Sequence, residues 1–205
     1  EFNKGAGGTG KTHYNLITDR GLINAVYVAP CHKLATEMYE KILKETGRSI
    51  PCIVLNRLLE EPYKIQERYI YKWRHYLIDE ASMISEGYKN ELMETLPNAI
   101  FMGDLDHQLK PVIDFVKLRK RFKDNIPNDY LKQMTTKGFD KIREFKTNYR
   151  FINCPKLTAL SEYLRTNKDK SINYNSLGLQ TITIDELKKT YKKEDMILRF
   201  NNELK

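Results

Sequence analysis

Short apolar runs alternate along the chain with stretches whose apolar residues recur at helical spacing. The runs predict buried strands at residues 25–29, 52–55, 75–78 and 99–102. Helices are predicted at residues 33–46 and 90–95, which lie between those runs. Because strands and helices alternate at this rhythm, the pattern predicts an α/β fold, with a parallel sheet and helices on both faces.

The second half of the chain has a less regular pattern. Residues 114–146 are polar and basic, and they predict helical stretches without a strand. Residues 154–165 predict a helix and residues 196–200 a late strand, while residues 69–73 give only a weak strand signal. The sequence shows no internal repeat, heptad run or Gly/Ser-rich linker.

The composition places the chain among globular proteins. Of its 205 residues 40% are hydrophobic, which suffices for a buried core and excludes a wholly disordered chain. No stretch approaches the roughly 18 uncharged apolar residues of a spanning helix, so no membrane partner is expected. The formal net charge of +8 suits a polyanionic partner, although many soluble proteins are as basic.

Cysteine and histidine are too few and too scattered for a disulfide framework or a zinc site. Cys31, Cys52 and Cys154 form no CxxC pair, and the four histidines form no cluster with them. Ordinary core or surface packing is therefore favoured for these residues. A reducing, intracellular compartment is expected.

A glycine-rich segment near the start of the chain carries the first candidate chemistry. Residues 5–12 read Gly-Ala-Gly-Gly-Thr-Gly-Lys-Thr, which fits the phosphate-loop pattern GxxxxGK[ST]. In that pattern the backbone N–H groups surround a phosphate, the lysine reaches the β- and γ-phosphates, and the hydroxyl ligates Mg²⁺. The alternative is a glycine-rich turn before a helix. The predicted nucleotide-binding residues are Gly5, Gly7, Gly8, Thr9, Gly10, Lys11 and Thr12, and Lys11 is expected to be an exposed cation.

A phosphate loop normally follows a buried strand, yet only four residues precede Gly5. We therefore expect the chain to begin inside that strand or to lack it. On this interpretation the sequence is a fragment of a longer protein.

Two adjacent carboxylates, Asp79 and Glu80, follow the predicted strand at residues 75–78. In phosphate-loop enzymes an aspartate at such a strand end holds Mg²⁺. The neighbouring glutamate can orient and deprotonate an attacking water. The alternative is an ordinary turn that ends the strand.

The segment that begins at Asp79 resembles motif II of superfamily 1 helicases, particularly the branch that contains RecD and Dda. Other segments are similar to motifs of that family, in the same order: residues 26–35 (motif Ia), 53–59 (motif Ib, weakly), 103–112 (motif III) and 147–150 (motif IV). Cys31 stands where the family usually has threonine, and Lys110 where proline is common. The resemblance runs from Gly5 to about Asn202. Motifs V and VI and the adenine-reading motif have no counterpart.

The resemblance implies a RecA-like phosphate-loop NTPase fold with ATP and Mg²⁺ as cofactors. Residues 1–146 would form the first motor domain, with a minimal insert near residues 60–74, and residues 147–205 would begin the second. Gln108 would contact the γ-phosphate, and Arg150 would be an arginine finger. The implied catalytic residues are Lys11, Glu80, Gln108 and Arg150, and the implied metal ligands are Thr12 and Asp79. For Gln108 and Arg150 the alternatives are a surface glutamine and a salt-bridged arginine.

The resemblance also implies a single-stranded nucleic-acid partner, with DNA favoured over RNA. The implied contact residues are Pro30, Cys31, His32, Lys33 and Arg57. Tyrosines and Trp73 alternate with cations in residues 60–74, where base stacking and core packing are both open. For the basic run at residues 117–123, a solvated helix face is favoured over nucleic-acid binding.

The function that follows from the resemblance is ATP-driven movement along a single strand, with a 5′→3′ direction, by a helicase or translocase. Viral or phage replication machinery is one setting that fits. An ATPase that remodels or translocates without unwinding is the main alternative. A non-catalytic module with a decayed motor and a small-molecule kinase are weaker alternatives. The oligomeric state stays open.

Overall fold

A computed structural model describes residues 1–17, 24–60, 75–96, 98–106, 111, 113–166 and 185–186. The chain divides into two compact units, Glu1–Asn153 and Cys154–Lys205. The sequence predicts a boundary slightly earlier, after residue 146. In the second unit, the described helix is α7 (Pro155–Thr166), which begins at a proline, as first helical turns often do.

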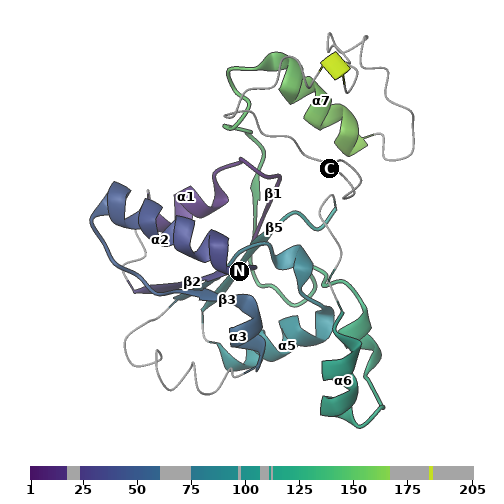
Figure 1. Cartoon of the computed structure of the whole chain (residues 1–205). Coiled ribbons are helices and arrows are strands. Elements are labelled where there is room, and N and C mark those ends of the chain that lie inside the picture. Colours follow the sequence, from purple (N-terminus) through teal and green to yellow (C-terminus); the bar gives the residue numbers. More distant parts are fainter. Residues whose placement is uncertain are drawn as a thin grey trace. The chain divides into compact units, whose positions relative to one another are not determined.

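The first unit is built on a parallel sheet (Figure 1). In the described part of the chain this sheet has six strands in the order β3-β2-β4-β5-β1-β6. The strands are β1 (Phe2–Gly5), β2 (Ala25–Ala29), β3 (Cys52–Val54), β4 (His75–Ile78), β5 (Ala99–Gly103) and β6 (Ile142–Phe145). Every pairing between neighbours is parallel, which confirms the predicted sheet.

Helices cover both faces of the sheet, as predicted. The described helices of this unit are α1 (Lys11–Leu16), α2 (His32–Thr46), α3 (Leu55–Glu60), α5 (Glu86–Thr95) and α6 (Phe115–Phe122). Leu16 of α1 and Ile42 of α2 pack in one core cluster with Tyr27 and Leu77. Leu58 of α3 and Leu92 of α5 lie in a second cluster, with Phe101. Each face of the sheet is therefore a separate apolar layer.

An aspartate begins one of these helices and a glycine ends another. Asp114 Oδ1 accepts a hydrogen bond from Lys117 N (3.0 Å), which caps the start of α6. Gly47 ends α2 with φ 67°, a left-handed conformation that glycine adopts without a steric cost. Leu55, which the apolar pattern assigns to a strand, instead begins α3.

Strand β6 contradicts the prediction that residues 114–146 contain no strand. It pairs with β1 in parallel, with Gly5 opposite Phe145. Its side chains are only partly buried, and Ile142 is 48% exposed, because β6 lies at the edge of the sheet. An edge strand needs little apolar character, which is why the polar sequence gave no signal.

Strand β1 is present before the phosphate loop, although the sequence leaves room for only a short one. Phe2 and Asn3 are fully buried, and β1 pairs with β5 on one side and β6 on the other. These four residues therefore form an internal strand of the sheet, paired on both sides.

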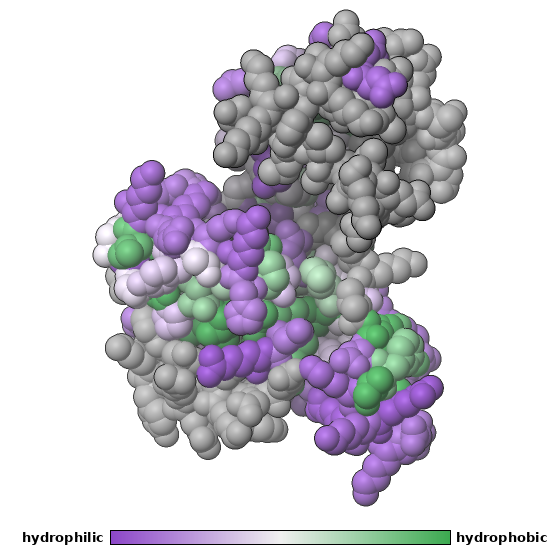
Figure 2. Space-filling model, viewed as in Figure 1, coloured by the Kyte–Doolittle hydropathy of each residue, from purple (hydrophilic) through white to green (hydrophobic). Residues whose placement is uncertain are grey.

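Within the described residues, no helix combines the length and the apolar character that a membrane crossing requires. The surface of α6 nevertheless carries an apolar patch with hydrophilic residues around it (Figure 2). Phe115 and Val116, which are 50% and 79% exposed, contribute to this patch.

Candidate nucleotide and nucleic-acid site

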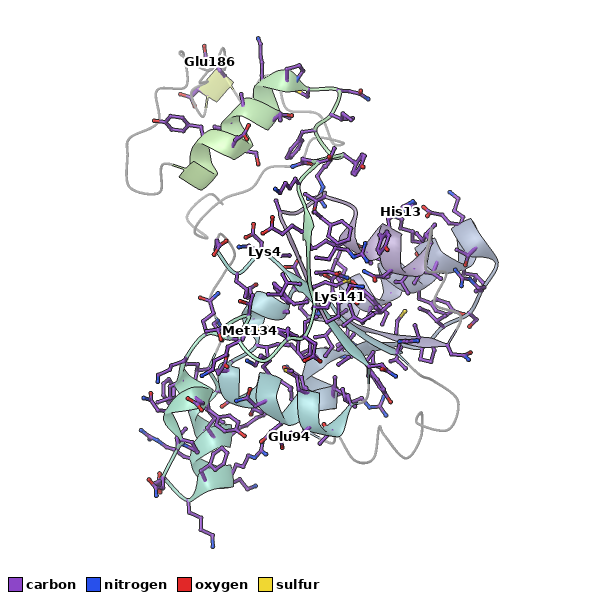
Figure 3. The ribbon with its side chains drawn as sticks, turned by 180° about the vertical axis from the view of Figure 1, so that it is seen from behind. Lys4, His13, Glu94, Met134, Lys141 and Glu186 are labelled. Atoms are coloured by element: carbon purple, nitrogen blue, oxygen red, sulfur yellow. The ribbon has the colours of Figure 1, made fainter. Side chains whose placement is uncertain are left out.

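The candidate residues gather at the carboxyl ends of the strands. Because the strands are parallel, their carboxyl ends share one edge of the sheet, where α/β folds usually bind ligands. Gly5 ends β1, Asp79 follows β4, and Pro30 follows β2. Lys4, labelled in Figure 3, lies near the same edge, close to the loop that follows β5. The topology therefore brings together motifs that are far apart in sequence.

The phosphate loop is held by its own polar groups. Gly8 and Gly10 have φ values of 82° and 81°, which favour glycine. Thr9 Oγ1 donates to Ala6 O (2.8 Å). Lys11 Nζ donates to Gly5 O (2.7 Å) and Ala6 O (2.8 Å). These bonds hold the Lys11 ammonium against the backbone at the start of the loop.

Lys11 is 8% exposed, so the expectation of an exposed cation is wrong. Burial lowers the pKa of its ammonium, while the negative charges of Asp79 and Glu80 oppose that shift. The two carbonyl contacts compensate for part of the lost hydration. A buried cation facing the loop is what an anionic phosphate would need as a partner.

Three donors hold the Asp79 carboxylate. Oδ2 accepts from the Thr12 hydroxyl (3.2 Å) and from the Tyr27 hydroxyl (2.6 Å), and Oδ1 accepts from Glu80 N (2.9 Å). Burial, together with the charge of Asp79, raises the pKa of Tyr27, so its hydroxyl stays protonated and remains a donor. Tyr27 is not among the site residues predicted from the sequence. Its only signal is a phenol inside an otherwise apolar strand.

Glu80 has an unusual backbone. Its φ of 51° places a non-glycine residue in the left-handed region, which costs about 1–2 kcal/mol. Such strain is often found at functional sites, where the surrounding structure imposes it. Here Asp79 Oδ1 accepts the Glu80 N–H, and Glu80 O accepts Met83 N–H (2.9 Å), so local bonds fix the turn.

The segment after β6 lies on the phosphate loop. Tyr149 N donates to Gly8 O (2.9 Å), and a methyl group built on Gly8 would lie 2.6 Å from Arg150 Cβ. A methyl group built on Gly7 would be 3.6 Å from Arg150 Nη1, so the guanidinium is close to the loop. The parallel pairing of β6 with β1 explains this position, since both strands end at the same edge.

The loop after β5 is tied to the end of β1. Lys4 Nζ lies 2.8 Å from Asp106 Oδ2, and this hydrogen bond raises the pKa of Lys4. Asp104 is 2% exposed and accepts from Asp106 N (3.3 Å). Gln108, the predicted γ-phosphate contact, lies outside the described residues.

Most of the predicted nucleic-acid residues line one hollow near the end of β2 and the start of α2. Its volume is about 1,090 Å³, and Pro30, Cys31, His32 and Arg57 are among its lining residues. Lys33 is outside this lining, with an 84% exposed side chain whose Nζ lies 3.9 Å from Glu37 Oε1. The structure thus brings together four of the five predicted residues, from the start of α2 and from α3.

Two further groups of basic residues were considered for nucleic-acid binding, and the structure describes one of them. The aromatic and basic residues of 61–74 lie outside the described residues. The basic run is on α6, where Arg121 pairs with Glu91 (2.5 Å) and lies over the ring of Tyr130. Arg121 therefore has a packing role in addition to its charge.

Comparison with known proteins supports the fold. No family model matches the chain, and no curated protein matches its sequence. Among solved structures it is similar to a Pif1 helicase from a study of DNA unwinding at forked double-stranded DNA, with a TM-score of 0.54 and 19% identity over 83% of this chain and 45% of that one. It is also similar to Bacteroides Pif1 bound to single-stranded DNA, with a TM-score of 0.53 and 20% identity over 86% of this chain and 44% of that one.

A third similar structure is Bacteroides Pif1 in complex with ADP-AlF4, with a TM-score of 0.51 and 20% identity over 83% of this chain and 43% of that one. This chain spans less than half of each of these three proteins. At such identities the likeness shows the fold, which is the RecA-like α/β fold predicted from the sequence.

Proposed function

We propose that the protein is an ATP-dependent helicase or translocase that couples hydrolysis to 5′→3′ movement along single-stranded nucleic acid. The observation that carries this proposal is the contact between Thr12 and Asp79, at 3.2 Å, beside a phosphate loop with a buried lysine. The RecA-like fold and its Pif1 neighbours support the same assignment. Placement in the RecD and Dda branch rests on the motif order.

The donor set fits Mg²⁺. Thr12 and Asp79 offer a hydroxyl and a carboxylate, which are the hard oxygen ligands this ion prefers. Mg²⁺ commonly takes one or two protein ligands, with water and phosphate oxygens completing its shell. When bound, the ion would neutralise developing charge on the phosphate oxygens. Thr12 and Asp79 would hold it.

The remaining residues supply positive charge and a base. Lys11 would exchange its carbonyl partners, Gly5 and Ala6, for phosphate oxygens. Glu80, fixed by its strained turn, would accept a proton from the attacking water. Arg150 would place a planar, permanently charged group near the transferred phosphoryl.

The strand site would use the hollow next to Pro30. Arg57 places a guanidinium there and His32 an imidazole whose N–H can donate to a phosphate oxygen, and both residues are exposed. Phosphate contacts of this kind bind a strand without reading its sequence. Two of the neighbouring structures contain or concern DNA, which supports DNA as the partner.

ATP turnover and strand displacement by the full-length protein test the proposal. We expect turnover to rise with single-stranded DNA, and displacement of a labelled strand from a 5′-tailed but not a 3′-tailed duplex. Lys11→Ala should abolish both, whereas Lys44→Ala, which removes an exposed lysine of α2, should abolish neither. Turnover without displacement would favour the non-unwinding alternative. Wild-type protein without turnover would refute the proposal.

A further inference from the structure

Tyr27 has a buried hydroxyl whose hydrogen-bond partner is a charged group. The side chain is 2% exposed, and its hydroxyl lies 2.6 Å from Asp79 Oδ2. A buried tyrosine usually finds a partner for its hydroxyl, and a carboxylate partner gives a shorter and stronger bond than a neutral one. Here the partner is the carboxylate proposed to hold Mg²⁺.

The sheet holds Tyr27 in place. In β2, Tyr27 is opposite Leu77 of β4 on one side and Cys52 of β3 on the other. Its ring packs in the core cluster that contains Leu16 of α1 and Leu77. The hydroxyl therefore has a fixed position, whereas an isolated carboxylate can rotate about its terminal bond.

We propose that Tyr27 is a positioning residue, which orients the Asp79 carboxylate for the metal through its hydroxyl. This inference rests on the proposed function and assigns a role that the sequence motifs do not contain. Glu80 N fixes Oδ1 and Tyr27 fixes Oδ2, so the plane of the carboxylate is set from both sides. Thr12, the other proposed ligand, meets the same Oδ2.

Groups that orient a metal ligand have a strong effect on the affinity of the site for its metal. Loss of such a partner typically weakens metal affinity or activity by about 10- to 100-fold. Phenylalanine at position 27 would keep the ring and its packing while removing only the hydroxyl. The expected result of Tyr27→Phe is therefore an increase of about 10-fold in the Mg²⁺ concentration that half-saturates the site.

The experiment measures the binding of a fluorescent ATP analogue to the full-length protein as Mg²⁺ is titrated, in parallel with ATP turnover. Affinity measured without Mg²⁺ should be the same in wild type and Tyr27→Phe, since the phosphate loop is unchanged. Tyr76→Phe is the matched control, because Tyr76 is also fully buried in the sheet but belongs to the other core cluster. It should leave the Mg²⁺ dependence unchanged.

A double variant separates orientation from a general loss of stability. In an Asp79→Asn background, the further change Tyr27→Phe should have no effect on the Mg²⁺ dependence, because the ligand it orients is gone. An additional loss there, equal to that in the wild-type background, would overturn the inference.

Failure of this inference and failure of the proposed function have different signatures. Equal Mg²⁺ dependence in wild type and Tyr27→Phe, with normal turnover, would overturn the role of Tyr27 alone. Wild-type protein that binds nucleotide without hydrolysing it would refute the proposed function, and the Mg²⁺ dependence of binding would still decide the role of Tyr27.

Discussion

Thr12 Oγ1 lies 3.2 Å from Asp79 Oδ2, although 67 positions separate the two residues in sequence. The contact exists because the helix that follows β1 and the end of β4 meet at the carboxyl edge of the sheet. Two motifs that are separate in the sequence thus become one set of oxygen donors. The proposed chemistry depends on this contact more than on either motif alone.

Asp79, which contacts Thr12, and the adjacent Glu80 should have separable roles. Glu80→Gln is expected to preserve Mg²⁺-dependent nucleotide binding and to lower ATP turnover by about 100-fold or more, because an amide cannot accept the proton. Asp79→Asn is expected to weaken the Mg²⁺-dependent part of binding, since it removes the ligand charge. Nucleotide titration with and without Mg²⁺, together with turnover, distinguishes the two variants. Loss of Mg²⁺-dependent binding in Glu80→Gln alone would reverse the assignment.

Much of the fold could be predicted because its strands are central and apolar. β2 and β4 coincide with the predicted ranges, and β5 extends one residue further. The phosphate loop and Asp79 could be recognised because their chemistry requires particular residues at a fixed spacing. In such cases local sequence and tertiary structure agree.

The parts that the sequence did not predict depend on contacts between distant segments. β6 is polar because only one of its edges pairs in this sheet, and without β6 nothing places Arg150 on the phosphate loop. Tyr27 looks like any strand residue until β4 brings Asp79 to its hydroxyl. Lys11 donates to two loop carbonyls, and their positions are defined only once the loop has folded.

Gly8 tests whether residues 148–150 pack on the phosphate loop. A methyl group there would lie 2.6 Å from Arg150 Cβ and 2.8 Å from Asn148 Oδ1, so Gly8→Ala should displace this segment. Gly47→Ala is the matched control, because Gly47 also has positive φ but has open space around it. Gly47→Ala should cost about 1 kcal/mol of unfolding free energy from its backbone alone.

Gly8→Ala is expected to cost more than Gly47→Ala in urea unfolding and to weaken nucleotide binding as well. The additional cost reflects the contact with residues 148–150, since both variants carry the same kind of backbone strain. Equal costs in the two variants, with normal nucleotide affinity in Gly8→Ala, would show that the segment does not pack on the loop in solution.

Two cysteines near the hollow should differ in reactivity. Burial raises the pKa of the Cys52 thiol to about 12, and only the thiolate is nucleophilic, so Cys52 should resist alkylation at pH 8–9. Cys31 is exposed and should be labelled first. Mass spectrometry of peptides after iodoacetamide treatment between pH 7 and 10 measures both. Cys52 is only partly exposed, and its labelling at the rate of Cys31 would contradict the raised pKa of its thiol.

The raised pKa of Cys52 also predicts a pH dependence of stability. The unfolded thiol ionises at its ordinary pKa of 9.0, while the folded thiol keeps its proton up to about 12. The unfolded state therefore binds fewer protons in this window, and the free energy of unfolding should fall as pH rises from about 9. Cys52→Ala should show a smaller decrease over the same range, measured by urea unfolding at pH 8 and pH 10. Parallel decreases in both proteins would contradict it.

Binding of a single strand should weaken steeply with salt and depend little on base sequence. Arg57 lines the hollow proposed as the strand site, and Lys33 follows the lining residue His32 in sequence. Both are exposed cations, and each phosphate that such a cation neutralises releases a counterion. For single strands the slope of log affinity against log salt is about −0.7 per contact, so Lys33→Ala and Arg57→Ala should each flatten it by about 0.7. Lys44→Ala, further along α2, should leave the slope unchanged.

Fluorescence anisotropy between about 50 and 200 mM salt measures the salt dependence of binding, and a comparison of oligo-dT with a mixed-sequence strand measures the dependence on base sequence. An unchanged slope in both Lys33→Ala and Arg57→Ala would place the strand elsewhere on the protein, because a cation that contacts a phosphate cannot be removed without changing the number of ions released.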